Sequence, residues 1–132
     1  MTEWTEKQRK ILGRVRTLRV ATISPQGDPF SAPVPFYFDG GTLYFASPAE
    51  SEQMANLRAN RRVALLADTS EDGVLQGFVV QGLAQRVRSD RESQAVREAM
   101  AAKYTDSPGG EGEGTLIKIA PVRILDLGAS PL

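Results

Sequence analysis

The sequence predicts a mainly β (α+β) protein built on a six-stranded antiparallel β-barrel with flanking helices. Three observations lead to this prediction. Six short apolar runs, rich in β-branched residues, are spread along the chain. The first three are joined by turns that are too short for a parallel crossover. Helical segments open the chain and interrupt the later strands, which is the pattern of an antiparallel barrel rather than of a parallel α/β sheet.

The composition is that of a single globular domain over residues 1–132. Hydrophobic residues make up 41% of the chain and charged residues 24%, and the 16 basic and 16 acidic side chains cancel. This balance gives no support for a nucleic-acid or membrane partner. Because no apolar run reaches the roughly 18 residues of a membrane span and no signal peptide opens the chain, we expect a cytoplasmic protein.

The chain contains neither cysteine nor histidine. Disulfides, thiolate metal sites and cysteine nucleophiles are therefore excluded. A Ser-His-Asp triad, the usual zinc sites and imidazole ligation of haem are excluded as well. We expect no metal site.

The first element is expected to be a helix that Thr2 or Thr5 caps. A strand over 19–24 should follow it. The apolar side chains of the helix recur at the spacing of one face, so the helix must lie on an apolar surface. These side chains are Trp4, Ile11, Leu12, Val15 and Leu18.

A hairpin follows the first strand. The Pro- and Gly-containing segment 25–29 predicts a turn, because proline presets φ and glycine permits positive φ. The second strand is expected at 30–38 and the third at 42–46. The Asp-Gly-Gly segment 39–41 between them is typical of a tight hairpin turn.

The next segment has the features of a helix start. Ser47 is expected to cap the helix, a proline follows at the first helical position, and Glu50 completes a capping box. The helix should run to about Asn60, with Met54 and Leu57 facing inward.

Strand four is expected at 62–67 and is followed by a polar turn at 68–73. The fifth strand is expected to be long, from 74 to 87. Glycine inside a strand often marks a bulge or bend, so Gly77 and Gly82 predict such irregularities.

Ser89 opens another capping box, and the helix behind it should reach about Tyr104. The Gly- and Glu-rich segment 107–114 predicts a mobile loop. The sixth strand is expected at 115–127, where Pro121 indicates a bulge or an edge position.

Several short motifs follow one another in an order and spacing that together are specific. They are VATI at 20–23, QGDP at 26–29, APVPF at 32–36, LYFAS at 43–47, Ser51, NLRANRRVAL at 56–65, QGLA at 81–84, Val87 and IAPVRI at 119–124. Over roughly residues 10 to 126 the chain resembles the pyridoxamine-5'-phosphate-oxidase-like, FMN-binding split β-barrel family.

This resemblance implies a homodimer of split barrels with two FMN sites in grooves between the protomers, each built from both chains. The expected partners are thus a second copy of the chain and a flavin nucleotide. The arrangement is physically sensible, because a half-open barrel leaves strand edges and apolar faces that a two-fold interface can bury.

The resemblance places the FMN phosphate where a strand passes into a helix, near Ser47 and Ser51. Hydroxyls and free amides at a helix start favour an anion. Gln53 stands where the family usually has lysine, so a charge-assisted hydrogen bond is missing. Arg62 is the candidate that would replace this charge, with Arg58 or Arg61 as alternatives, although a surface role explains these arginines as well.

The flavin ring is expected over the second strand, where Pro33, Val34 and Pro35 would present backbone groups to it. Core packing is the simpler explanation for the side chain of Val34. The partner chain would contribute Gln76 and Gly77, the place where the family presents a polar side chain to the flavin. Plain solvent exposure explains Gln76 equally well.

Three functions remain open. The first is an oxidoreductase that uses FMN, or the deazaflavin of one branch of the family. The second is a flavin carrier without turnover, and the third is a cofactor-free dimeric binding protein. The missing lysine favours the last two, whereas the ability of backbone amides to hold phosphate keeps flavin binding first. The sequence identifies no catalytic residue, and vitamin B6 oxidation is not expected because the Trp- and Arg-containing extension of those enzymes is not seen in this chain.

Overall fold

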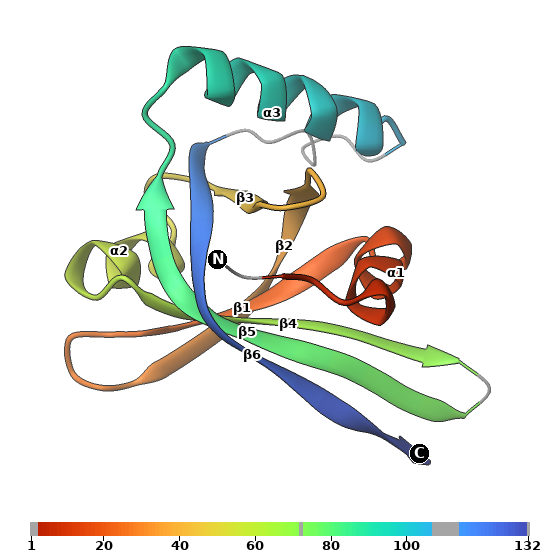
Figure 1. Cartoon of the computed structure of the whole chain (residues 1–132). Coiled ribbons are helices and arrows are strands. Elements are labelled where there is room, and N and C mark those ends of the chain that lie inside the picture. Colours follow the sequence, from red (N-terminus) through yellow and green to blue (C-terminus); the bar gives the residue numbers. More distant parts are fainter. Residues whose placement is uncertain (1–2, 72, 107–113, 132) are drawn as a thin grey trace.

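The computed structural model describes residues 3–71, 73–106 and 114–131. Within them, six strands close a barrel in the order β1-β2-β3-β6-β5-β4, every neighbouring pair is antiparallel, and three helices flank the barrel (Figure 1). The elements are α1 (Glu6–Arg14), β1 (Thr17–Ile23), β2 (Pro29–Phe38), β3 (Leu43–Ser47), α2 (Glu52–Ala59), β4 (Arg62–Glu71), β5 (Val74–Arg86), α3 (Asp90–Lys103) and β6 (Thr115–Pro131). The predicted barrel and the order of its elements are confirmed.

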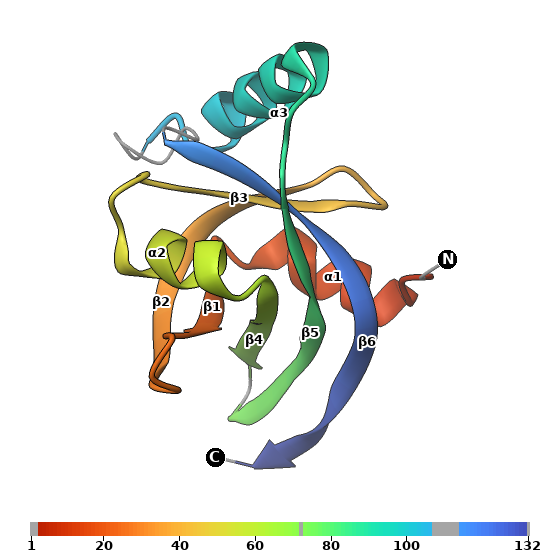
Figure 2. The same cartoon turned by 90° about the vertical axis from the view of Figure 1, so that its left-hand side faces the viewer.

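Two apolar clusters hold these elements together. The larger one fills the barrel, where Phe36, Phe45 and Phe78 are completely buried. The smaller one lies beneath α3, which covers the end of the barrel where β5 stops and β6 begins (Figure 2). The start of β5 and the end of β6 lie away from α3, and the C-terminus lies there with them.

Helix α1 is capped by Thr5, whose side chain accepts a hydrogen bond from the Gln8 backbone while the Gln8 side chain bonds back to Thr5. The apolar face of this helix is shorter than predicted, because the helix ends at Arg14. Leu18 belongs to β1, where pairing with Val34 holds it extended.

The predicted start of α2 is wrong. Ser47 is the last residue of β3, because β6 reaches far enough for Thr115 to pair with it. The cap is Ser51, whose hydroxyl accepts a hydrogen bond from the backbone N–H of Met54 at 3.3 Å. Met54 and Leu57 are buried as predicted.

The predicted polar turn at 68–73 is largely strand. Each residue of β4 from Asp68 to Glu71 has a partner on β5, so cross-strand pairing outweighs the local preference of the polar residues for a turn. The irregularities predicted at Gly77 and Gly82 are confirmed by two shifts in the β5–β6 register. At the second shift Val122, next to Pro121, has no partner and is 73% exposed.

No helix in the described part of the chain combines the length and the apolar character that crossing a membrane requires. Of the predicted mobile loop at 107–114, only Gly114 lies within the described residues.

Candidate functional site

Three residues predicted to contact a phosphate form one hydrogen-bonded cluster. The Oγ atoms of Ser47 and Ser51 lie 2.7 Å apart, and Gln53 Nε2 donates to Ser47 Oγ at 2.7 Å. Ser47 is 1% exposed and Gln53 is 6% exposed. The structure therefore brings Ser47, Ser51 and Gln53 together where β3 passes into α2, with Ser47 and Gln53 buried and Ser51 half-buried. We call this group the Ser-Gln cluster.

One atom of the Ser-Gln cluster is unsatisfied. Gln53 Oε1 is buried and has no hydrogen-bond partner, and it is the only side-chain nitrogen or oxygen atom in this condition among the described residues. An unsatisfied buried polar group costs about 1–3 kcal/mol. Such an atom in a native fold calls for an explanation, and a bound molecule that supplies the missing hydrogen bond is one.

The Ser-Gln cluster can form a hydrogen bond with either a donor or an acceptor group of a ligand. In the observed orientation, Gln53 Oε1 can accept one hydrogen bond. A half-turn of the carboxamide would exchange Oε1 and Nε2, so that Nε2 could donate instead, while Ser47 would donate to Oε1 and Ser51 to Ser47. The cluster thus fits a hydroxyl or phosphate oxygen through neutral groups.

No basic side chain bonds to the Ser-Gln cluster in the described part of the chain. The exposed residues Glu50 and Glu52 add negative charge beside it. Arg62 is also exposed, and the hydrogen bond at this residue is made by its backbone N–H to Asn60 Oδ1. The predicted replacement of the lysine charge by Arg62 is not seen in the single chain.

Gly114 closes one side of the Ser-Gln cluster. Its φ of 93° favours glycine, and a Cβ there would lie 2.4 Å from the carbonyl oxygen of Ser47. Arg97 donates to the Gly114 carbonyl at 2.9 Å and ties this point to α3. The main chain before β6 can therefore lie directly against the end of β3.

The predicted ring surface lies on β2. Val34 is 2% exposed and packs inside the barrel, which confirms core packing for its side chain. Pro33 is exposed and Pro35 half-buried, on the opposite face of the strand. The two prolines leave that face with few backbone N–H donors.

Gln76 and Gly77 are far from the Ser-Gln cluster along the sheet. Gly77 pairs with Leu127, whereas Ser47 pairs with Thr115, and these two partners are twelve positions apart on β6. Gly77 also has a packing role, since a Cβ there would lie 2.5 Å from the carbonyl oxygen of Ala67. One chain alone does not bring the two groups together.

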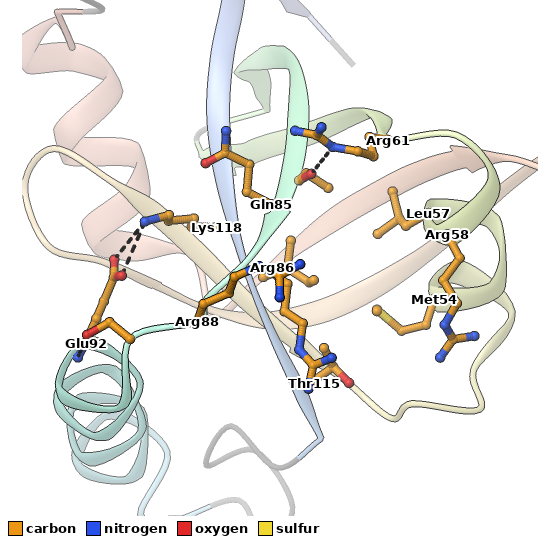
Figure 3. Close-up of a pocket in the computed structure, with 13 residues that line it drawn as sticks. Met54, Leu57, Arg58, Arg61, Gln85, Arg86, Arg88, Glu92, Thr115 and Lys118 are labelled. Atoms are coloured by element: carbon orange, nitrogen blue, oxygen red, sulfur yellow. Dashed lines mark hydrogen bonds and ion pairs between the residues drawn. The ribbon is translucent and has the colours of Figure 1, made fainter.

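A second feature is an open pocket of about 670 Å³ between α2, the end of β5, the start of α3 and the start of β6 (Figure 3). Met54 and Leu57 point into it from α2. Its lining residues are Met54, Leu57, Arg58, Arg61, Ala84, Gln85, Arg86, Arg88, Ser89, Glu92, Thr115, Ile117 and Lys118. We call it the arginine pocket.

Sequence reasoning did not predict the arginine pocket. The sequence indicates Arg58 and Arg61 as alternative contacts for a flavin phosphate or as surface residues, and no motif contains Arg86 or Arg88. A signal exists in the sequence, because these last two residues are exposed and flank the buried Val87 at the two-residue spacing of a strand face.

One wall of the arginine pocket holds a paired carboxylate. Lys118 Nζ lies 3.2 Å from Glu92 Oε1, and Tyr44 Oη donates to Glu92 Oε2 at 2.7 Å. The hydrogen bond from Tyr44, together with Lys118, lowers the pKa of Glu92. Burial and the hydrogen bond to Glu92 raise the pKa of Tyr44. Glu92 is therefore ionised and Tyr44 protonated at neutral pH.

No group of three or more acidic side chains that could hold a metal ion occurs in the ranges the structure describes.

Comparison with known proteins gives one family and a common fold. The family model described as pyridoxamine 5'-phosphate oxidase matches residues 4–128. No curated protein sequence matches.

Three solved structures illustrate the shared fold. An FAD-binding protein from Mesorhizobium loti is 22% identical, covers 96% of this chain and 95% of its own, and has a TM-score of 0.73. The heme storage protein HutZ from Vibrio cholerae is 17% identical, with coverages of 98% and 95% and a TM-score of 0.75. A protein described as an F420 reductase is 21% identical, with coverages of 92% and 98% and a TM-score of 0.71. At these identities the likeness shows the fold alone.

Proposed function

Because this chain belongs to the pyridoxamine 5'-phosphate oxidase family, we propose that it binds a flavin nucleotide as a homodimer and acts as a flavin-dependent oxidoreductase. The family is matched over almost the whole chain. An FAD-binding protein and an F420 reductase share the fold. The heme alternative is disfavoured by the lack of histidine, the usual axial ligand.

The observation that carries the proposal is the Ser-Gln cluster. A buried hydroxyl, a half-buried hydroxyl and a buried carboxamide lie together beside a helix start, and one polar atom there is unsatisfied. The fold alone does not need this arrangement, because an apolar residue at Gln53 would avoid the cost of an unpaired group. A ligand that donates a hydrogen bond to Oε1, or a phosphate oxygen that accepts one from Nε2 after a half-turn of the carboxamide, accounts for it.

Ser47, Ser51 and Gln53 would hold the phosphate of FMN, and the backbone of β2 at Pro33, Val34 and Pro35 would lie under its ring. When bound, the flavin supplies hydride transfer through its ring. The hydroxyls and the carboxamide orient the phosphate and exclude water from it, but without a cation they give a weaker site than one with lysine.

The position of Gln76 and Gly77 supports the homodimer. Both residues lie a long way along β5 from the Ser-Gln cluster, so a site that includes all five residues requires the β5 start of a second chain. A two-fold axis would build two equal sites of this kind. Leu127, which pairs with Gly77, is 39% exposed and would be covered by such contact.

The neutral Gln53 supports a second candidate. A carrier or a cofactor-free dimer of the same fold needs no tight phosphate site, and a deazaflavin in place of FMN would bring a different set of anionic contacts. FMN still ranks first because the family match covers residues 4–128 and backbone amides can hold a phosphate without a lysine.

The test is a binding experiment on the purified chain. Protein is incubated separately with FMN, FAD and F420, passed through gel filtration, and measured for absorbance and molar mass. We expect a dimer that retains oxidised flavin at one per chain. A protein that stays colourless with all three cofactors would refute flavin binding. Consumption of reduced cofactor with a panel of acceptors then separates an enzyme from a carrier.

A further inference from the structure

The arginine pocket concentrates positive charge in a chain whose net charge is zero. Five of its thirteen lining residues are Arg or Lys, and one is acidic. That acidic residue, Glu92, is already paired with Lys118. The other four cationic residues are therefore not balanced within the pocket: Arg58, Arg61, Arg86 and Arg88.

These guanidinium groups retain free donors. Arg58 donates to the carbonyl of Ala49, and Arg61 Nε donates to the carbonyl of Ala84 at 3.0 Å, so each is anchored by one bond. Arg86 and Arg88 make no side-chain hydrogen bond or ion pair within the described part of the chain. Because a guanidinium carries five N–H donors, all four can bind an anion without breaking these anchors.

The acidic groups nearby do not cancel this charge. Asp90 lines a neighbouring hollow of about 380 Å³ that shares Arg86 and Arg88 with the arginine pocket. Asp90 is the one acidic side chain among the described residues that line this hollow. The basic surface thus continues around the connection between β5 and α3.

Part of the lining of the arginine pocket is apolar. Met54, Leu57 and Ile117 line it and are buried. A volume of about 670 Å³ is typical of pockets that bind small organic molecules, which span roughly 300–1,000 Å³. A ligand that fits therefore has a ring-sized apolar body and an anionic group at the rim.

The arginine pocket and the Ser-Gln cluster lie on different faces of α2. Met54, Leu57 and Arg58 line the pocket, whereas none of the residues of the Ser-Gln cluster does. Asn56 points the other way, toward β1, and its Nδ2 donates to Thr22 Oγ1 at 3.0 Å. The two features adjoin at Met54 and Thr115 but are lined by different side chains, so they are distinct places for a ligand.

We propose that the arginine pocket is a second ligand site, which binds an organic phosphate ester with an aromatic or similarly apolar body. Guanidinium groups pair with carboxylate and phosphate oxygens alike through two parallel hydrogen bonds, but a phosphate ester carries more negative charge and three acceptor oxygens, which suits a pocket with four arginines. The site is independent of whether flavin binds at the Ser-Gln cluster.

The test uses 1-naphthyl phosphate as the probe, with binding followed by calorimetry and by changes in backbone amide shifts. Inorganic phosphate lacks the ring, 1-naphthol lacks the charge, and 1-naphthoate replaces phosphate by carboxylate. We expect the naphthyl phosphate to bind at least about tenfold more tightly than each of these, as a charge-assisted contact implies. The shifts should be largest at residues 84–89 and 115–118.

Variants then locate the site. The double variant Arg86→Gln/Arg88→Gln should weaken naphthyl phosphate binding by at least about tenfold. The matched control Arg91→Gln/Arg123→Gln removes the same charge from exposed residues that do not line the pocket, and it should bind like the wild type. Equal weakening in both doubles, or no binding to the wild type, would overturn the proposal.

Flavin titrations distinguish a ligand site in the arginine pocket from the proposed flavin site at the Ser-Gln cluster. If FMN binds to the Arg86→Gln/Arg88→Gln variant as it does to the wild type and does not displace naphthyl phosphate, two sites exist. If FMN displaces the probe and the double variant loses FMN, the separate site is refuted and the flavin phosphate lies in the arginine pocket. If no flavin binds while naphthyl phosphate does, flavin binding fails and the arginine pocket stands.

Discussion

Gln53 combines two properties that rarely meet in one side chain. It is buried, and one of its amide atoms has no partner. It also occupies the position at which a cation would favour a phosphate. The affinity of the Ser-Gln cluster for an anion therefore depends on this residue more than on the two serines, which supply hydroxyls with or without a charge.

The change Gln53→Lys should tighten FMN binding about tenfold, because a neutral contact becomes a charge-assisted hydrogen bond worth about 1.5–3 kcal/mol. Without FMN the variant should unfold more easily than the wild type, since its new charge is buried and unpaired. Fluorescence titration with FMN and urea unfolding with and without FMN measure the two effects.

The control for this change is Gln26→Lys. Gln26 lies in the exposed turn between β1 and β2, so this variant adds the same charge away from the Ser-Gln cluster. It should bind FMN like the wild type. Equal affinities in all three proteins would mean that the phosphate does not bind at Gln53.

At the scale of elements, α3 is held on the barrel through its C-terminal end. Tyr104 Oη donates to the carbonyl of Arg16 at 2.6 Å and accepts from the backbone N–H of Phe36 at 3.0 Å. Lys103 Nζ donates to the carbonyl of Phe36 at 2.9 Å and lies over the ring of that residue. The helix that covers the barrel end is thus fixed to β2 by two adjacent side chains.

This docking makes stability depend on pH. Burial, together with the charge of Arg16, lowers the pKa of Lys103 from 10.5 to about 8. Between these values the unfolded chain binds more protons at this site than the folded chain, so the contribution of Lys103 to stability rises with pH. Burial raises the pKa of Tyr104, which acts in the opposite direction at higher pH. The effect of Lys103 on stability can therefore be measured without that of Tyr104 between about pH 8 and about pH 9.5.

Urea unfolding across this window should show the effect as a difference between proteins. The free energy of unfolding of the wild type should rise with pH relative to that of Lys103→Met, which cannot titrate there. Lys7→Met, at an exposed position of α1, should follow the wild type. Parallel curves for the wild type and Lys103→Met would show that Lys103 keeps an ordinary pKa in the fold.

Local sequence patterns predicted most of the elements correctly, and the predictions that were wrong have a common cause. The turn at 39–41 and the cap at Ser89 were predicted correctly because side chains within a few residues satisfy their backbone groups. Ser47 was expected to cap a helix and instead ends β3, since Thr115, far along the chain, supplies its partner. The end of β4 is expected to be a turn and is instead strand for the same reason, because β5 pairs with it.

At the scale of the whole molecule, sequence motifs predicted the Ser-Gln cluster but not the arginine pocket. The residues of the cluster lie within seven positions of one another, from 47 to 53, so a motif can record them. Those of the pocket come from α2, β5, α3 and β6, and only the closed barrel brings Arg58 near Arg88 and Lys118. A charge balance of zero for the chain conceals such a local excess.

The proposed homodimer has two flavin sites, and each combines the Ser-Gln cluster of one chain with the Gln76 region of the other. This arrangement can be tested with mixed dimers. Gln53→Glu places a negative charge beside the phosphate position, and Gln76→Glu places one on the opposite side of the same site. In a dimer that contains one chain with each change, one flavin site carries both changes and the other carries neither.

Flavin titration of these mixed dimers, isolated through two different affinity tags, is the most direct measurement. Both parent homodimers should bind FMN weakly, and the mixed dimer should regain one site per dimer with the affinity of the wild type. Mixed dimers that bind no better than their parents, or a wild-type chain that remains a monomer in solution, would contradict a flavin site shared between two chains.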